Sequence, residues 1–175
     1  MLRISVICGA INSGKTSFLA DFVKEAEVSF KMGGVISPKR FEKGEFLGYD
    51  LMEVTTGMIQ PILRKGENPG VESIGNFNIV NQGFQEGNHI IVNSLNCEIL
   101  IIDEIGILEL EGRGFRRGLE KALAEYRSEL VLSIRESLVG AYKELMAVYS
   151  GEIVFLYPDY WDRLKVMIES KRERR

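Results

Sequence analysis

A segment near the start of the chain has the residue types and spacing of a loop that binds phosphate groups. Residues 9–16 read Gly-Ala-Ile-Asn-Ser-Gly-Lys-Thr and match the pattern G-x4-G-K-S/T at every fixed position. Backbone N–H groups of such a loop, with the free N–H groups of a following helix, replace the hydration of a polyphosphate. Lys15 would place a cation against the β- and γ-phosphates. The residues that we expect to bind phosphate are Gly9, Ala10, Ile11, Asn12, Ser13, Gly14, Lys15, Thr16 and Ser17.

Two carboxylates follow the most apolar segment of the chain. Asp103 and Glu104 come directly after an aliphatic run, and parallel sheets bind ligands at the carboxyl ends of their strands. We expect Thr16 and Asp103 to hold Mg²⁺, Asp103 through a coordinated water. Glu104 is the candidate base for an attacking water, a role typical of enzymes in which another strand separates the acidic strand from the first one. The strand predicted near 34–37 is available to intervene.

Other side chains have weaker claims to a role. Arg135 follows a predicted strand beside the acidic strand and could reach a terminal phosphate, although a solvated charge is the simpler interpretation. A surface position is also favoured for three neighbouring arginines: Arg113, Arg116 and Arg117. Packing in a sheet is favoured over contact with a purine for three aromatic residues: Phe41, Phe46 and Tyr49.

Length and composition are those of an ordinary globular protein. The 175 residues are 45% hydrophobic and 27% charged, which predicts a single domain spanning 1–175. The net charge of −3 does not favour a nucleic-acid partner. No apolar run approaches a membrane span and no signal-cleavage pattern is present, so we expect a cytoplasmic protein. Cys8 and Cys97 are expected to be buried hydrophobes, and His89, as the only histidine, excludes a His-based zinc site.

The spacing of apolar residues predicts strands that alternate with helices. Strands are expected at 4–8, 35–37, 98–103, 130–134 and 153–157, and helices at 14–27, 82–95, 113–127 and 137–148. A last helix would be capped by Asp159 and carry Trp161 into the core. Residues 39–66 break the alternation, with a hairpin, a further strand at 59–63 and then a loop at 67–70. The pattern indicates a three-layer α/β fold with a mostly parallel central sheet and an antiparallel edge insert at about 39–66.

Several segments together resemble a known family. Residues 103–110 read Asp-Glu-Ile-Gly-Ile-Leu-Glu-Leu and are similar to the D-E-I-G-x-M-E-L signature of small P-loop nucleoside-triphosphatases. This family was first described from thermophiles and includes the human cancer-related nucleoside-triphosphatase. Residues 33–37, 48–50 and 75–81 resemble its G-G-F-x-T, G-F-D and G-x-Y-x-V-N segments in the same order, and Phe84 fits the aromatic residue that follows. The resemblance covers about residues 1–127.

The resemblance implies a RecA-like P-loop core and slow, Mg²⁺-dependent hydrolysis of several nucleoside triphosphates to diphosphate and phosphate. It also implies phosphate binding by residues 9–16, magnesium binding by Asp103 and a role as base for Glu104. The family usually carries acidic residues and an arginine just after the G-G-F-x-T strand, where this chain has Pro38-Lys39-Arg40-Phe41. Leu108 replaces the usual methionine, a swap of similar volume.

Three functions remain open from the sequence. The first is a nucleoside-triphosphatase that acts on ATP, GTP and other nucleotides, and the absence of the guanine-reading N-K-x-D motif fits loose base choice. The second is a small-molecule or nucleotide kinase, in which the 39–66 insert and the Arg113–Arg117 run build an acceptor pocket. The third is a nucleotide-gated binding protein. The oligomeric state is not determined, and a monomer is compatible with the sequence.

Overall fold

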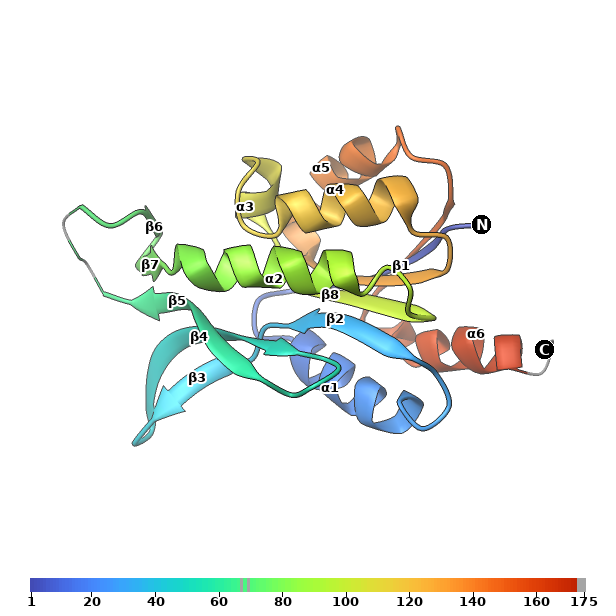
Figure 1. Ribbon diagram of the computed structural model, residues 1–175, viewed down its shortest axis with the longest axis horizontal. Helices are drawn as coiled ribbons and strands as arrows, with labels where there is room; N and C mark the ends of the chain where they lie inside the picture. The colour runs from blue at the N-terminus through green and yellow to red at the C-terminus, as the bar shows by residue number, and fades with distance from the viewer. Residues whose placement is uncertain (67, 69, 173–175) are drawn as a thin grey trace.

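The protein, described by a computed structural model, forms one mixed sheet with helices on both faces (Figure 1). The structure describes residues 1–66, 68 and 70–172, so the predicted loop at 67–70 lies partly outside the described residues. The strands are β1 (Arg3–Gly9), β2 (Met32–Ile36), β3 (Lys39–Glu42), β4 (Glu45–Glu53), β5 (Ile59–Lys65), β6 (Ser73–Ile74), β7 (Phe77–Ile79), β8 (Ile99–Ile105), β9 (Glu129–Arg135) and β10 (Glu152–Leu156). The helices are α1 (Lys15–Ala26), α2 (Asn81–Asn93), α3 (Ile107–Leu110), α4 (Arg116–Glu125), α5 (Val139–Met146) and α6 (Arg163–Arg172), with short 3₁₀ turns at Glu136–Leu138 and Pro158–Tyr160.

The sheet has a parallel half and an antiparallel half. Its strand order is β10-β1-β9-β8-β2-β4-β5-β7-β6, with β3 paired to β4. The strands from β10 to β2 are parallel, and every pairing from β2 to β4 onward is antiparallel. The predicted α/β architecture with an antiparallel insert is therefore confirmed. The insert continues beyond residue 66 to Ile79, because β6 and β7 extend the same sheet.

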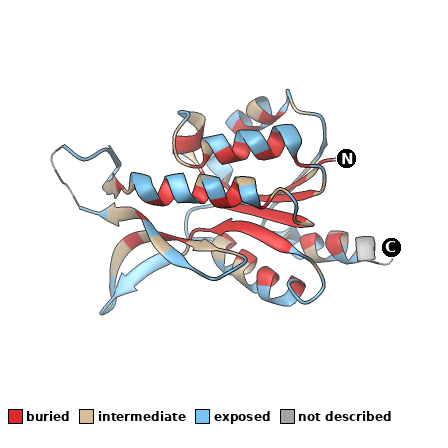
Figure 2. Ribbon diagram, viewed as in Figure 1, coloured by how far each residue is buried: buried red, intermediate tan, exposed pale blue. Residues whose placement is uncertain are grey.

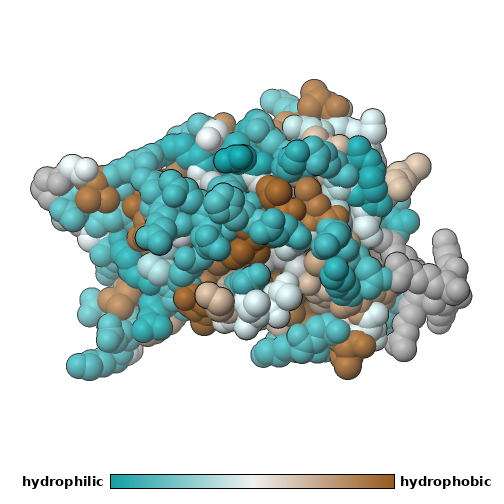
Figure 3. Space-filling view, in the orientation of Figure 1, coloured by the Kyte–Doolittle hydropathy of each residue, from teal (hydrophilic) through white to brown (hydrophobic). Residues whose placement is uncertain are grey.

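Two apolar layers hold the helices against the sheet. Helices α2, α4 and α5 cover one face and helices α1 and α6 the other, and each of these helices contributes residues to a buried apolar cluster (Figures 1 and 2). Residues alternate along β8, so that Leu100 and Ile102 belong to one buried cluster and Ile99 and Ile101 to the other. Such two-sided burial explains why the parallel strands are apolar throughout. The outer surface in the same view is mostly hydrophilic, with small separate hydrophobic patches (Figure 3).

The strand that separates β1 from β8 is β9. The expectation that residues 34–37 would intervene is wrong, because β2 lies on the far side of β8. The physical reason lies in the two strands themselves. Strand β9 is buried along almost its whole length and pairs with parallel neighbours on both sides, whereas β2 joins the parallel half to the antiparallel β4. The separation of the first strand from the acidic strand is nevertheless present.

Strand β2 begins earlier than the sequence indicated. A strand was expected only at 35–37, but Gly33 and Gly34 also lie inside β2. Gly34 has a φ of 103°, and a Cβ added there would lie 2.0 Å from the carbonyl oxygen of Ile101 on β8. Glycine thus permits close approach of two backbones here rather than a turn.

Two further expectations need correction near the chain end and at the cysteines. Asp159 does not cap the last helix, because it lies in a 3₁₀ turn and α6 begins only at Arg163. Trp161 precedes that helix and is half-buried.

Cys8 is fully buried, and burial raises the pKa of its thiol to about 11, whereas Cys97 is only partly buried. Among the described residues, no helix has the length and apolar character needed to cross a membrane.

Candidate active site

The loop that links β1 to α1 has the backbone conformation that its glycines suggested. Gly14 precedes α1 with a φ of 93°, and Asn12 also has a positive φ, 62°. Helix α1 has no side-chain cap at its N-terminus and no acidic residue in its first turn. Its first N–H groups and the positive end of its dipole are therefore available to an anion.

A tryptophan from the other end of the chain supports this loop. A Cβ added at Gly9 would lie 2.5 Å from Ser13 Oγ and 3.1 Å from Cζ2 of Trp161. The Trp161 indole N–H donates to the Cys8 carbonyl at 3.0 Å, and its ring packs on Phe18 at 5.4 Å between centroids. Trp161 therefore packs against the start of the phosphate loop and stabilises its position. No sequence pattern indicated this role.

The lysine of the loop is held inside it. The Lys15 side chain is only 3% exposed, and its ammonium donates to the carbonyls of Gly9 at 3.1 Å and Ala10 at 2.9 Å. A buried ammonium group without hydrogen-bond partners would destabilise the fold, and these two carbonyls supply the partners. The cation is thereby positioned in the concave side of the loop.

Asp103 is fully buried and surrounded by hydrogen-bond donors. Its carboxylate accepts from the Ser37 backbone N–H at 3.0 Å and from the Ser133 hydroxyl, and the Thr16 hydroxyl lies near enough to lower the pKa of this carboxylate. Burial raises the pKa of Asp103, and these hydrogen bonds and the charge of Lys15 oppose the rise. The structure thus brings Thr16 of α1 and Asp103 of β8 together, as predicted.

Glu104 adopts a left-handed backbone conformation at an irregular position near the end of β8. Its φ is 59°, and the pairing of β8 with β9 is irregular between Ile102 and Ile105. The Glu104 N–H donates to the Ser133 hydroxyl at 2.8 Å. Burial, followed by the charge of Asp103, raises the pKa of Glu104. A non-glycine residue with this φ is uncommon, and such strain concentrates at functional sites.

Ser133 therefore organises both acids, and its removal should be measurable. Its hydroxyl accepts from the Glu104 N–H while donating to the Asp103 carboxylate. We expect Ser133→Ala to lower the free energy of unfolding by about 1–3 kcal/mol, because both partners are left short of a hydrogen bond in the interior. Urea denaturation measures this change. The control Ser150→Ala, at an exposed position, should change it by less than about 0.5 kcal/mol, and equal effects would remove Ser133 from this role.

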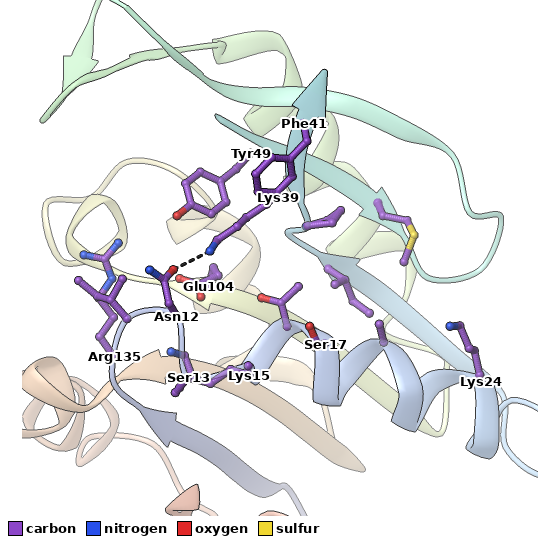
Figure 4. Close-up of a pocket in the computed structure, with 17 residues that line it drawn as sticks. Asn12, Ser13, Lys15, Ser17, Lys24, Lys39, Phe41, Tyr49, Glu104 and Arg135 are labelled. Atoms are coloured by element: carbon purple, nitrogen blue, oxygen red, sulfur yellow. Dashed lines mark hydrogen bonds between the residues drawn. The ribbon is translucent and has the colours of Figure 1, made fainter. Parts of the chain in front are cut away.

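A cavity of about 550 Å³ opens between the phosphate loop and the antiparallel insert (Figure 4). Glu104 and Arg135 line its wall beside the loop. From the insert, Lys39 donates to Asn12 Oδ1 at 2.6 Å across the cavity. Other residues that line it are Ile36, Phe41, Tyr49 and Met52. The charges of Lys15, Arg135 and Lys39 all oppose the rise in the pKa of Glu104, so three cations surround this carboxylate.

The remaining arginine candidates lie elsewhere, and their surface interpretation is confirmed, because Arg117 is exposed and Arg113 and Arg116 are partly exposed. Arg113 pairs with Glu72 and Glu111, while Arg116 pairs with Glu120 at 2.7 Å and donates to the Glu109 carbonyl. These pairs hold loops and helix ends together. Neither arginine lines the cavity at the phosphate loop, and Arg117 lines a separate hollow with α2 residues. The acceptor pocket expected at Arg113–Arg117 is therefore absent from the P-loop cavity.

The aromatic candidates divide into two groups. Phe46 packs edge-on against Tyr49 and Phe77, at 5.4 and 6.0 Å between ring centroids, which confirms packing in the sheet. Phe41 is 55% exposed and, with Tyr49, lines the cavity. The sequence offered a signal for Lys39, since it stands where the chain departs from the family pattern, and for Ser37, which stands at the threonine of the G-G-F-x-T segment. It offered none for Ser133.

Comparisons with known proteins agree with this geometry. The family model described as NTPase matches residues 4–168. The nucleoside-triphosphatase THEP1 of Pyrobaculum islandicum is 25% identical over 156 residues, which cover 89% of this chain and 85% of that protein.

Two solved structures share the fold. The crystal structure of THEP1 from the hyperthermophile Aquifex aeolicus has a TM-score of 0.68 at 20% identity and covers 93% of both chains. The solution structure of a human cancer-related nucleoside triphosphatase has a TM-score of 0.70 at 18% identity and covers 99% of both. The family match spans nearly the whole chain, so this chain belongs to the NTPase family and is a nucleoside-triphosphate phosphohydrolase.

Proposed function

We propose that the protein hydrolyses nucleoside triphosphates to diphosphate and phosphate in a Mg²⁺-dependent reaction with loose base specificity. The observation that carries the proposal is that Glu104 and the loop at residues 9–16 line the same cavity. A polyphosphate seated on that loop would extend its terminal phosphate toward the carboxylate.

Phosphate binding would use the loop and the start of α1. The uncapped N–H groups of α1 and the backbone of the loop would take the phosphate oxygens. Lys15 would exchange the Gly9 and Ala10 carbonyls for the β- and γ-phosphates, since charge-assisted hydrogen bonds to phosphate are stronger than those to neutral carbonyls.

The donor set around Asp103 fits Mg²⁺. The ion prefers a few hard oxygen ligands and keeps several waters, and the Thr16 hydroxyl and the Asp103 carboxylate supply such oxygens near each other. In the described part of the chain, no cluster of three His, Cys, Asp or Glu residues is present, which suits a metal held largely by phosphate and water. Thr16 and Asp103 would hold the ion, which supplies positive charge to the phosphate oxygens when bound.

Glu104 would act as the base. It would accept a proton from a water whose oxygen forms a bond to the γ-phosphorus as the bond to the β-phosphate oxygen breaks, and the diphosphate leaves with the electron pair. Its raised pKa, due first to burial, favours proton acceptance. Arg135 and Lys39 would stabilise the charge on the transferring group.

The cavity supports loose base choice. Its walls beyond the loop are formed largely by apolar side chains, Ile36, Phe41 and Met52 among them. An apolar or aromatic surface packs on any base because every base has a π-face, whereas discrimination requires hydrogen bonds to the base edge. ATP, GTP and CTP are therefore all expected as substrates.

A phosphate-release assay tests the proposal. The protein would be incubated with ATP, GTP or CTP, each with Mg²⁺ or with EDTA. We expect release from all three nucleotides with Mg²⁺ and none with EDTA. Release from one nucleotide only would contradict loose specificity. Tight nucleotide binding with negligible turnover would favour the nucleotide-gated alternative if the turnover increases when a partner protein is added.

Lys39 provides a sharper test of the charge around the γ-phosphate. We expect Lys39→Ala to lower kcat about fivefold, because an exposed ion pair is worth up to about 1 kcal/mol. Lys43→Ala, in the exposed turn of the same hairpin, is the matched control and should leave kcat unchanged. Steady-state phosphate release measures both variants. Equal kcat values for the two would assign Lys39 to loop packing alone.

A further inference from the structure

A second cavity, of about 300 Å³, lies on the other side of Glu104. Two packed ring pairs line it: Phe84 with Phe115 at 4.9 Å between centroids, and Tyr49 with Phe77 at 5.7 Å. Aliphatic side chains complete the lining, namely Ile62, Leu63, Ile74, Ile107 and Leu108. A concave, mainly apolar cavity of this size with a few polar groups has the character of a small-molecule site.

The two cavities share a wall that carries the reactive groups. Glu104, Tyr49 and Arg135 line both of them. The carboxylate that would receive the proton of the nucleophile is therefore accessible from the phosphate loop on one side and from the apolar cavity on the other. Figure 4 shows these three side chains at the edge of the P-loop cavity.

The second acid in the cavity is already satisfied. Glu109 accepts from the Gly106 N–H at 2.7 Å and from the Phe115 N–H at 2.8 Å, and is 2% exposed. It holds the loop after β8 in place. The Ser37 N–H and hydroxyl are both hydrogen-bonded to Asp103, which leaves Glu104, Arg135 and the Tyr49 hydroxyl as the groups that can meet a ligand. A cationic ligand would be repelled by Arg135 and would neutralise Glu104, so an uncharged or anionic ligand fits.

A water nucleophile needs no apolar cavity beside its base. We propose that this second cavity binds a phosphoryl acceptor, a small uncharged or anionic aromatic compound that carries a hydroxyl group, and that the protein transfers the γ-phosphoryl group to it. The inference rests on the proposed function, because it uses the same nucleotide and the same base.

The transfer step is the hydrolytic step with the nucleophile exchanged. The hydroxyl oxygen of the acceptor forms a bond to the γ-phosphorus, and its proton passes to Glu104. The bond from phosphorus to the β-phosphate oxygen breaks, and the nucleoside diphosphate leaves with the electron pair. The products are a phosphate monoester and the diphosphate, and the aromatic ring excludes water from the line of attack.

Benzyl alcohol and para-hydroxymethylbenzoate are suitable probes, since each has one ring and one hydroxyl group. At millimolar concentrations we expect them to shift the NMR signals of the Ile62, Leu63 and Leu108 methyl groups in the methyl-labelled protein. With Mg–ATP, phosphorus NMR should show the corresponding phosphate monoester beside inorganic phosphate. Toluene, which lacks the hydroxyl, should shift the same methyl groups without giving a monoester.

Filling the cavity should abolish these effects. Ile74→Trp fills the cavity from the insert, and Ile107→Trp fills it from α3. If one variant does not fold, the other still tests the proposal. Both should lower the ratio of monoester to phosphate at least tenfold and remove the methyl shifts. Ile59→Trp, an exposed position in the same insert that does not line the cavity, is the control and should keep both.

The outcomes separate this inference from the proposed function. Phosphate release without any probe tests hydrolysis alone. Absence of methyl shifts with every probe overturns the acceptor site while hydrolysis stands. Formation of inorganic phosphate without any phosphate monoester, although a ring alcohol is bound, does the same. Methyl shifts without phosphate or monoester would instead overturn the shared catalytic machinery and with it both proposals.

Discussion

Glu104→Gln should lower kcat by roughly 10²- to 10⁴-fold, the range that a positioned general base contributes. Glutamine preserves the volume and can keep the backbone hydrogen bond to Ser133, but it cannot accept the proton of the nucleophile. The affinity for Mg–ATP should stay within a few-fold, because Glu104 lines the cavity but is not part of the loop that would bind the phosphates. Single-turnover phosphate release gives the rate, and calorimetry gives the affinity.

A matched control makes this result specific. Glu45→Gln, at an exposed position in β4 outside both cavities, removes the same charge and should leave kcat unchanged. If Glu104→Gln hydrolyses ATP at the normal rate, the assignment of the base is wrong. If kcat and affinity both collapse, Glu104 acts mainly in binding or folding rather than in proton transfer.

Lys15→Ala should weaken nucleotide binding and turnover together. Two charge-assisted contacts to phosphate, at about 1.5–3 kcal/mol each, correspond to a loss of roughly 10²- to 10⁴-fold in kcat/KM. The substitution also frees the Gly9 and Ala10 carbonyls, which the ammonium occupies in this structure. Calorimetry with Mg–ATP and a steady-state assay measure the two effects.

The control for this substitution is Lys31→Ala, at an exposed position outside both cavities. It removes the same charge and should leave affinity and rate unchanged. Normal Mg–ATP affinity in Lys15→Ala would show that the loop does not seat the polyphosphate, and the proposed function would fall with it. A thermal unfolding curve for each variant separates loss of the site from loss of the fold.

The sequence by itself determined the features that depend on neighbouring residues. The phosphate loop could be predicted because Gly9, Gly14 and Lys15 act within one turn between a strand and a helix. The apolar run before Asp103 predicted a buried strand for the same reason, since burial on both faces leaves a local signature. The hairpin of β3 and β4 was also visible in its turn residues.

Contacts between distant segments could not be derived in this way. The position of β9 between β1 and β8 depends on which strands can be buried on both sides, a property of the whole sheet. The Ser133 hydroxyl reaches Asp103 and Glu104 only because β9 lies there, and Trp161 reaches the phosphate loop from 153 residues away along the chain. Residue spacing encodes local conformation, whereas side-chain contacts across a sheet depend on strand order and register, which packing of the complete chain decides.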